Sequence, residues 1–314
     1  MKRSVITLAL ALLLNLALGG ALTVSGVPSP NTQVNLAPIA ENLELTTYRG
    51  VSVSGRLMAV DPENDSLTFE IVTSPRKGTI KLGDDGWFVY TPAEGKKGRD
   101  YFGYKAKDAG GNYSQEATAI IKIEKQKTAV SYSDLRGSGD EYAALRLAEE
   151  GVFVGTCLSG NYLFSPETEV TRGEFLAMCL KTADIHVLSG VTRTGFDDDE
   201  SIPLWVKPYV STALLTGIIS GHGEESFAPV FAADEPISFS EAAVVLNQTL
   251  GITDVAAVSA PVSDTAPVWA RQALANLAAC HVLPEDMSGH YGCLTRADAA
   301  SMLLGAARVL DNRQ

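Results

Sequence analysis

A five-residue phrase occurs three times in the second half of the chain, and this repetition limits the folds open to it. The copies are Val170-Thr171-Arg172-Gly173-Glu174, Ile237-Ser238-Phe239-Ser240-Glu241 and Leu294-Thr295-Arg296-Ala297-Asp298. A repeated phrase marks a repeated structural unit, and such units bury their apolar faces against one another. The sequence therefore predicts three related units, at residues 130–188, 192–252 and 260–312.

Each phrase is typical of the start of a helix. A hydroxyl residue is followed three positions later by an acid, and together they form a capping box that satisfies two free backbone N–H groups. Apolar residues at helical spacing follow each phrase, beginning at Phe175, Ala242 and Ala299. The predicted capping residues are Thr171 with Glu174, Ser238 with Glu241, and Thr295 with Asp298.

The residues upstream of each phrase predict a first helix and a loop. Each unit begins with an apolar or aromatic residue followed by an aspartate. Its first helix ends at a segment that starts with glycine in the first two units and with histidine in the third. The openings are Tyr132-Ser133-Asp134, Phe196-Asp197-Asp198 and Val262-Ser263-Asp264, and the helix ends are Gly151 to Gly155, Gly217 to Gly221 and His281-Val282-Leu283. Phe164-Ser165-Pro166 and Phe227-Ala228-Pro229 then precede the phrase, with Tyr291 in the third unit. Each unit is predicted to be helix, loop, helix.

These motifs resemble the S-layer homology domain, with which bacteria attach proteins to their cell wall. The resemblance covers roughly residues 130–310 and implies an all-α bundle of three repeats. It also implies a partner, a secondary cell wall polysaccharide that often carries an acidic pyruvyl ketal, held in grooves between the repeats.

The same resemblance implies which residues bind the polymer. Arg172 and Arg296 occupy the arginine position of the family phrase, and guanidinium suits a carboxylate because its donors are fixed and its charge is permanent. Phe239 replaces the arginine in the second unit. The alternative is that each arginine is a solvated charge in the first turn of its helix. Trp205 and Trp269 line the grooves or, alternatively, are buried anchors between helices.

The four cysteines fall within two of the units. Cys157 and Cys179 lie in the first, and Cys280 and Cys293 in the third. Disulfide pairing within each unit is one interpretation, which would suit an exported protein. Free buried thiols are the other. The four histidines, His186, His222, His281 and His290, have no metal-ligand spacing.

The N-terminus predicts export. Lys2-Arg3 precede an apolar run from Val5 to about Leu22, and Gly19-Gly20-Ala21 offers small residues for cleavage. Residues 1–25 are therefore predicted to be a secretory signal, and the proline-containing residues 26–39 a linker. The alternative is an uncleaved membrane anchor, since the run approaches the length that spans a bilayer. No second membrane span is predicted.

Residues 40–125 have the alternating pattern of β-strands. Strands are predicted at 51–60, 67–72, 79–82, 87–91, 101–107 and 117–123, separated by turn signals such as Gly110-Gly111-Asn112. About 90 residues with this alternation of apolar and polar residues favour a β-sandwich. Three phrases, Val60 to Phe69, Trp87 to Pro92 and Asp100 to Tyr104, resemble those of bacterial cadherin-like and immunoglobulin-like surface domains. The chain is thus predicted to be multidomain, an all-β sandwich followed by an all-α repeat bundle.

In some relatives of such domains the acidic loop binds calcium. Asp61, Glu63, Asp65 and Asp108 supply hard oxygen ligands of the right type. The alternative is that Asp61, Asn64 and Asp65 form Asx-type turns. No other cofactor is expected.

Charge and motifs narrow the class of function. A net charge of −12 argues against binding of nucleic acid. The sequence offers no nucleophile with its base, no metal-ligand cluster and no marked carboxylate pair. The leading hypothesis is a non-catalytic surface protein anchored to wall polysaccharide and displaying a sandwich whose own partner is unknown. The rival is a calcium-dependent adhesin whose sandwich carries the activity while the repeats are structural, and an enzyme is a third possibility.

Overall fold

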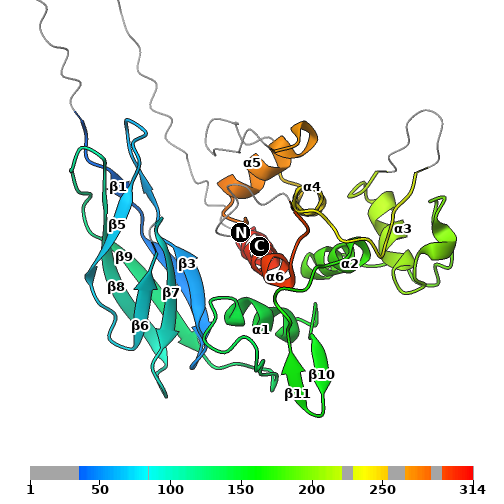
Figure 1. Cartoon of the computed structure of the whole chain (residues 1–314), viewed down its shortest axis with the longest axis horizontal. Coiled ribbons are helices and arrows are strands. Elements are labelled where there is room, and N and C mark those ends of the chain that lie inside the picture. Colours follow the sequence, from blue (N-terminus) through cyan, green and yellow to red (C-terminus); the bar gives the residue numbers. More distant parts are fainter. Residues whose placement is uncertain (1–34, 84, 221–228, 254–265, 284–291, 314) are drawn as a thin grey trace, which may run out of the picture. The chain divides into compact units, whose positions relative to one another are not determined.

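The computed structural model describes residues 35–83, 85–220, 229–253, 266–283 and 292–313. The predicted signal segment, most of the linker, Asp264, Phe227-Ala228, Tyr291, His222 and His290 lie outside these residues. Within them, strands fill the first part and helices dominate the second, in the order expected (Figure 1).

The first part is a sandwich of two sheets. One sheet has the order β2-β9-β8-β5, with bounds Leu43–Tyr48, Ala117–Glu124, Gly98–Lys107 and Thr68–Thr73. The other has the order β3-β7-β6, with bounds Val53–Arg56, Trp87–Pro92 and Gly78–Leu82. The short strands β1 (Ile39–Ala40) and β4 (Ala59–Val60) form a separate pair. All pairs are antiparallel except β2 with β9, which is parallel.

The core of the sandwich comes from alternate residues of the central strands. Phe102 and Tyr104 of β8, and Phe88 and Tyr90 of β7, are buried, as the two-residue period of a strand requires. The rings of Phe88 and Phe102 meet edge to face, with centroids 5.3 Å apart. Because these strands belong to different sheets, this contact joins the two layers.

Two details of the strand prediction are wrong. The strand expected at 51–60 is divided, because β3 pairs with β7 while β4 pairs with β1, and buried Leu57 lies between them. Strand β2 was not predicted. It is an edge strand whose partner, β9, is distant in the sequence, so only the tertiary fold brings the two together.

The described residues of the second part contain three pairs of helices, one pair for each predicted unit. They are α1 (Glu141–Glu149) with α2 (Arg172–Thr182), α3 (Lys207–Leu215) with α4 (Phe239–Leu250), and α5 (Arg271–Ala279) with α6 (Arg296–Asp311). Two short 3-10 turns, η1 (Asp199–Ser201) and η2 (Val268–Ala270), precede α3 and α5. We call the three units repeats 1, 2 and 3.

The first helix of every repeat ends in a left-handed residue. Gly151 and Gly217 have φ values of 68° and 74°, as expected for a glycine after a helix. His281 takes the same place in repeat 3 with φ 54°. A side chain in this conformation is strained, so repeat 3 keeps the geometry without the residue that best suits it.

Repeat 1 also contains a hairpin that was not predicted. Strands β10 (Thr156–Leu158) and β11 (Asn161–Leu163) pair around Ser159-Gly160, whose φ values are both positive. A two-residue turn of this kind is the favoured hairpin connection.

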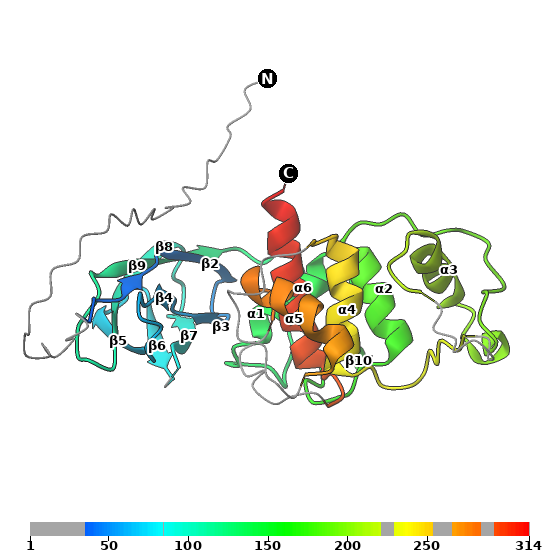
Figure 2. The ribbon, with the colours of Figure 1, turned by 90° about the horizontal axis from the view of Figure 1, so that it is seen from above.

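The three repeats close on one another through their second helices. Helices α2, α4 and α6 pack together (Figure 2). Just before these helices in the chain, three backbone hydrogen bonds join the repeats. Val170 N–H donates to Leu294 O at 2.9 Å, Leu294 N–H to Ile237 O at 2.8 Å, and Ile237 N–H to Val170 O at 2.9 Å. These three residues are buried and precede the three capping residues. The hydrogen bonds therefore form a ring that joins repeat 3 back to repeat 1.

Candidate binding site between the repeats

All three capping boxes are present. Thr171 N–H donates to Glu174 at 3.0 Å, Ser238 N–H to Glu241 at 2.9 Å, and Thr295 N–H to Asp298 at 3.1 Å, while each cap hydroxyl accepts from the backbone of its acid. The boxes fix where α2, α4 and α6 begin. The residue after each cap is thereby held at a defined place.

That place is the boundary with the next repeat. Arg172 N–H donates to Glu235 O at 3.0 Å, Phe239 N–H to Gly292 O at 2.9 Å, and Arg296 N–H to Thr168 O at 2.9 Å. Repeat 1 thus meets repeat 2, repeat 2 meets repeat 3, and repeat 3 meets repeat 1. We call the positions of Arg172, Phe239 and Arg296 the boundary positions.

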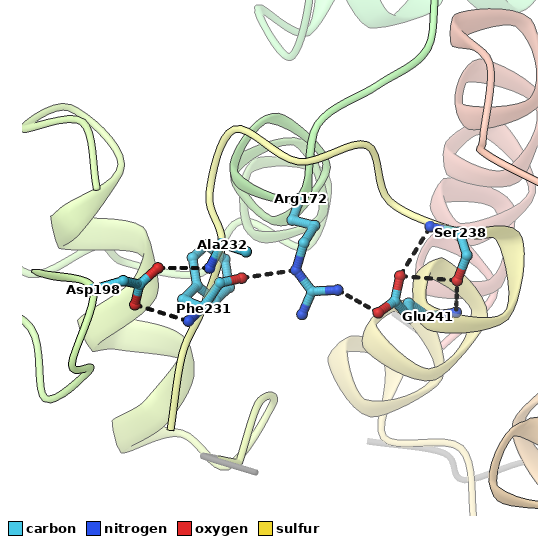
Figure 3. Close-up of polar contacts among 6 residues, drawn as sticks. All are labelled: Arg172, Asp198, Phe231, Ala232, Ser238 and Glu241. Atoms are coloured by element: carbon cyan, nitrogen blue, oxygen red, sulfur yellow. Dashed lines mark hydrogen bonds and ion pairs between the residues drawn. The ribbon is translucent and has the colours of Figure 1, made fainter. Parts of the chain in front are cut away.

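Arg172 is held by two groups of repeat 2 (Figure 3). Its Nε–H donates to Phe231 O at 2.8 Å, and its guanidinium forms an ion pair with Glu241. It also lies over the Phe231 ring, 5.7 Å from the centroid. The side chain keeps 27% of its surface exposed. Arg172 is therefore not the solvated charge of the alternative interpretation.

Arg296 contacts repeat 1 in a related way. Its guanidinium donates to Phe164 O at 3.2 Å and lies over the ring of Phe153, 5.1 Å from the centroid. It lines a small pocket together with Phe153, Phe164, Glu174 and Met178. No ion pair joins Arg296 to a carboxylate in the part of the chain that the structure describes.

The opening aspartates hold the loops that these arginines contact. Asp198 accepts from Phe231 N–H at 2.9 Å and from Ala232 N–H at 2.7 Å (Figure 3). Asp134 accepts in the same way from Phe164 at 3.1 Å and from Ser165 at 2.7 Å. This role was not predicted, although the aspartate that opens every unit was a signal for it.

These bonds also correct the alignment of the repeats. Ser165 and Ala232 have left-handed φ values of 58° and 53°, and both follow a phenylalanine held by an aspartate. The counterpart of Phe164-Ser165 is therefore Phe231-Ala232. The predicted counterpart, Phe227-Ala228-Pro229, lies earlier in the chain and shares only the Phe-x-Pro pattern.

Both tryptophans are exposed. Trp205 keeps 53% and Trp269 60% of its surface accessible. Each lies two positions before a first helix, α3 or α5, and is followed by a buried residue, Val206 or Ala270. The interpretation of these side chains as buried anchors is wrong.

An ion pair near the start of repeat 2 makes its stability depend on pH. Lys207 Nζ lies 2.9 Å from an Asp199 oxygen, and Asp199 also accepts from Thr194. The hydrogen bond from Lys207, with those from Thr194, lowers the pKa of Asp199 to about 2. A carboxylate whose pKa falls on folding stabilises the fold above its unfolded pKa, and this contribution is lost as the pH falls toward the folded value.

We therefore expect Asp199→Asn to be destabilising near neutral pH and less so as the pH falls from about 4 toward 2. Urea unfolding of the wild type and the variant across this range measures the difference. A difference that does not change with pH would contradict the assignment. Asp197→Asn, an exposed neighbour, is the control.

The structure does not form the predicted disulfides. All four cysteines are free, so the pairs Cys157 with Cys179 and Cys280 with Cys293 are absent. Cys179 is fully buried on α2, where burial raises the pKa of its thiol, whereas Cys157 is exposed on β10. The two side chains of the first pair thus lie in different surroundings.

Two of the four acidic residues of the predicted calcium site, Asp61 and Asp108, accept hydrogen bonds within turns. Asp61 Oδ1 accepts from the N–H groups of Glu63 and Asp65, each at 3.0 Å, and Asp108 accepts from Asn112 N–H at 2.8 Å. No group of three His, Cys, Asp or Glu side chains that could hold a metal occurs among the described residues. Asp61, Glu63, Asp65 and Asp108 therefore do not come together as a metal site. Calcium binding stays a prediction for calorimetric titration.

The apolar segment of residues 5–22, predicted to be a signal or an uncleaved anchor, lies outside the residues that the structure describes. Among the described residues, no helix has both the length and the apolar character that a membrane crossing needs.

The two-sheet topology and the position of the strands agree with a known family. Residues 35–124 match the bacterial Ig domain. The immunoglobulin-like part of the prediction is thus confirmed, and we call these residues the Ig domain. Such domains occur in surface proteins and in proteins associated with glycoside hydrolases.

Two relatives are glycan-degrading enzymes by name. An amylopullulanase of Thermoanaerobacterium thermosulfurigenes is 22% identical over 285 residues, which cover 90% of this chain and 14% of that protein. The exoglucanase XynX of Acetivibrio thermocellus is 27% identical over 114 residues, 35% of this chain and 10% of that protein. This chain spans only a small part of the length of either relative.

Among solved structures, the fibronectin(III)-like modules of CbhA from Clostridium thermocellum align with a TM-score of 0.23 at 14% identity. The alignment covers 32% of this chain and 53% of that one.

Proposed function

We propose that this chain is a non-catalytic surface protein whose three repeats bind a polysaccharide of the cell wall and hold the Ig domain at the surface. The repeats resemble S-layer homology domains in their phrases. The three capping boxes and the closed ring, together with the opening aspartates of repeats 1 and 2, are consistent with three copies of one unit.

The exposed tryptophans are the observation that carries the proposal. Folding alone favours burial of an indole, yet Trp205 and Trp269 are more than half exposed at corresponding positions of repeats 2 and 3. The residues before them, Leu204 and Val268, are exposed as well, at 66% and 79%. Exposed apolar surface that recurs at one place marks a binding site. A flat, exposed aromatic ring suits the apolar face of a sugar.

The arginines add selectivity for an acidic polymer. The chain carries a net charge of −12 and repels a polyanion at long range. A carboxylate on the polymer must therefore be bound locally, by guanidinium groups at fixed positions. Two of the three boundary positions, those of Arg172 and Arg296, carry a guanidinium and are the candidates for this contact.

The test is retention on purified wall sacculi with and without their secondary polymer. The wild type is expected to bind only when the polymer is present. We expect the double variant Trp205→Ala with Trp269→Ala to weaken retention by about tenfold or more, because it removes both aromatic contacts with the polymer. A tenfold loss corresponds to roughly 1.4 kcal/mol of binding free energy. Tyr101→Ala is the matched control, because Tyr101 is an exposed aromatic residue of the Ig domain.

Two outcomes would contradict the proposal. One is equal retention of the wild type on sacculi stripped of the polymer. The other is a double tryptophan variant that is folded and retained as well as the wild type. Circular dichroism of each variant establishes that it is folded.

A further inference from the structure

We infer that the two arginines have different tasks: Arg296 binds the carboxylate of the polymer, whereas Arg172 is a positioning residue that joins repeat 1 to repeat 2. The inference rests on the proposed function. It assigns the anion site to the boundary between repeats 3 and 1.

The two side chains begin from equivalent positions. Both follow a capping residue, both donate to the carbonyl of a phenylalanine in the next repeat, and both lie over an aromatic ring. Their backbone N–H groups bond to corresponding carbonyls. Any difference in binding must therefore come from the other groups around them.

That difference is the carboxylate of Glu241. It forms an ion pair with Arg172 and also accepts from the N–H and the hydroxyl of Ser238, at 2.9 Å and 2.8 Å. Burial raises the pKa of Glu241, but the bonds from Ser238 and the charge of Arg172 outweigh it and hold the pKa below its usual range. Arg172 thus already has an ionised counterion. A polymer carboxylate would have to displace Glu241 and leave it unpaired, which is unfavourable for a part-buried charge.

Arg296 lacks this counterion. The acid equivalent to Glu241 at its boundary is Glu174, which lines the same pocket but accepts from Thr171 N–H and forms no ion pair with Arg296. Arg296 gives one hydrogen bond to a neutral carbonyl among the described residues, while a guanidinium has five N–H donors. Its positive charge is therefore available to an anion.

The rest of the pocket is apolar. Besides Arg296 and Glu174, its lining consists of Phe153, Phe164, Met178, Leu147 and Val170, with Ala299 and Ala300 of α6. An apolar lining lowers the competition from water and strengthens a charge-assisted bond. The predicted ligand is thus a carboxylate on a sugar, bound with its charge at Arg296.

The experiment compares single variants on polymer-bearing sacculi. Arg296→Ala is expected to weaken retention by at least tenfold, whereas Arg172→Ala, if folded, should stay within about threefold of the wild type. Arg99→Ala in the Ig domain removes the same charge from an exposed site and serves as control. Raising the salt concentration should weaken the wild type but have little further effect on Arg296→Ala.

A rescue variant makes the test sharper. Glu241→Gln keeps the capping box, because Gln also serves at that position, but it removes the counterion of Arg172. Adding Glu241→Gln to Arg296→Ala should therefore restore part of the lost retention. This result would be expected only if Arg172 does not bind the polymer in the wild type because Glu241 neutralises its charge.

Failure of the inference can be told from failure of the proposed function. If the wild type binds stripped sacculi equally well, the proposed function itself is overturned. If the wild type requires the polymer but Arg172→Ala loses as much retention as Arg296→Ala, only the division of tasks is overturned. If Arg172→Ala does not fold, the rescue variant decides, and no recovery on adding Glu241→Gln counts against the inference.

Discussion

Replacing Asp198 with alanine is expected to lower the free energy of unfolding by about 3–5 kcal/mol. Its carboxylate accepts two backbone N–H groups, from Phe231 and Ala232, through separate oxygens. Hydrogen bonds to a charged acceptor contribute about 1.5–3 kcal/mol each. In the variant the two backbone N–H groups lose their acceptor while they remain part-buried. Ala232 also has a left-handed backbone that the lost bond helps to maintain.

Chemical denaturation of the isolated variant measures this effect. Asp197→Ala is the matched control, since Asp197 is the adjacent aspartate and is exposed. It should change the stability by no more than about 0.5 kcal/mol. If the two variants are equally stable, the loop is not held by Asp198. Because the loop supplies the carbonyl for Arg172, the stability of this boundary should fall as well.

A second large effect is expected in the Ig domain, where Asp100→Ala should cost about 3–5 kcal/mol. Asp100 is buried on β8 and accepts from Arg76 N–H at 3.0 Å, Lys77 N–H at 2.8 Å and the Tyr90 hydroxyl at 2.8 Å. Burial raises the pKa of this carboxyl, but the hydrogen bonds outweigh it and keep the pKa below its ordinary value. Alanine leaves three donors without their partner, and buried donors are costly to leave unsatisfied.

Tyr90→Phe separates the contributions. It removes one of the three donors and keeps the ring, so it should cost only about 1 kcal/mol. Thermal unfolding of both variants gives the comparison. A similar loss for Tyr90→Phe and Asp100→Ala would mean that the two backbone bonds contribute little.

Much of the local structure could be predicted because its causes are local. A capping box depends on two residues three positions apart, so Thr171 with Glu174 and its two copies were identified from the sequence. The sheets of the Ig domain followed from strand alternation, and their class is confirmed by the family match. The hairpin of repeat 1 was missed because its strands have only three residues each.

The contacts between repeats could not be predicted in the same way. Arg172 and Glu241 are 69 residues apart, and nothing in either phrase shows that they meet. The two carbonyls that receive the arginines belong to loops held by Asp134 and Asp198, and a carbonyl leaves no mark on a sequence. The exposure of the tryptophans was likewise decided by which faces of the repeats pack together. The sequence pattern thus identified the residues at the boundaries, whereas their contact partners are known only from the fold.

The ring of three backbone hydrogen bonds fixes the number of copies. In an open array each unit can be followed by another, so copies are gained or lost with little effect on the others. Here Val170, Ile237 and Leu294 each use both the N–H and the C=O on the other two, and a fourth copy would find no free partner. Loss of one copy would leave two buried ends unsatisfied. The loops and boundary residues can therefore differ between the copies, as they do at Phe239 and His281, whereas the closed ring has no place for a fourth copy.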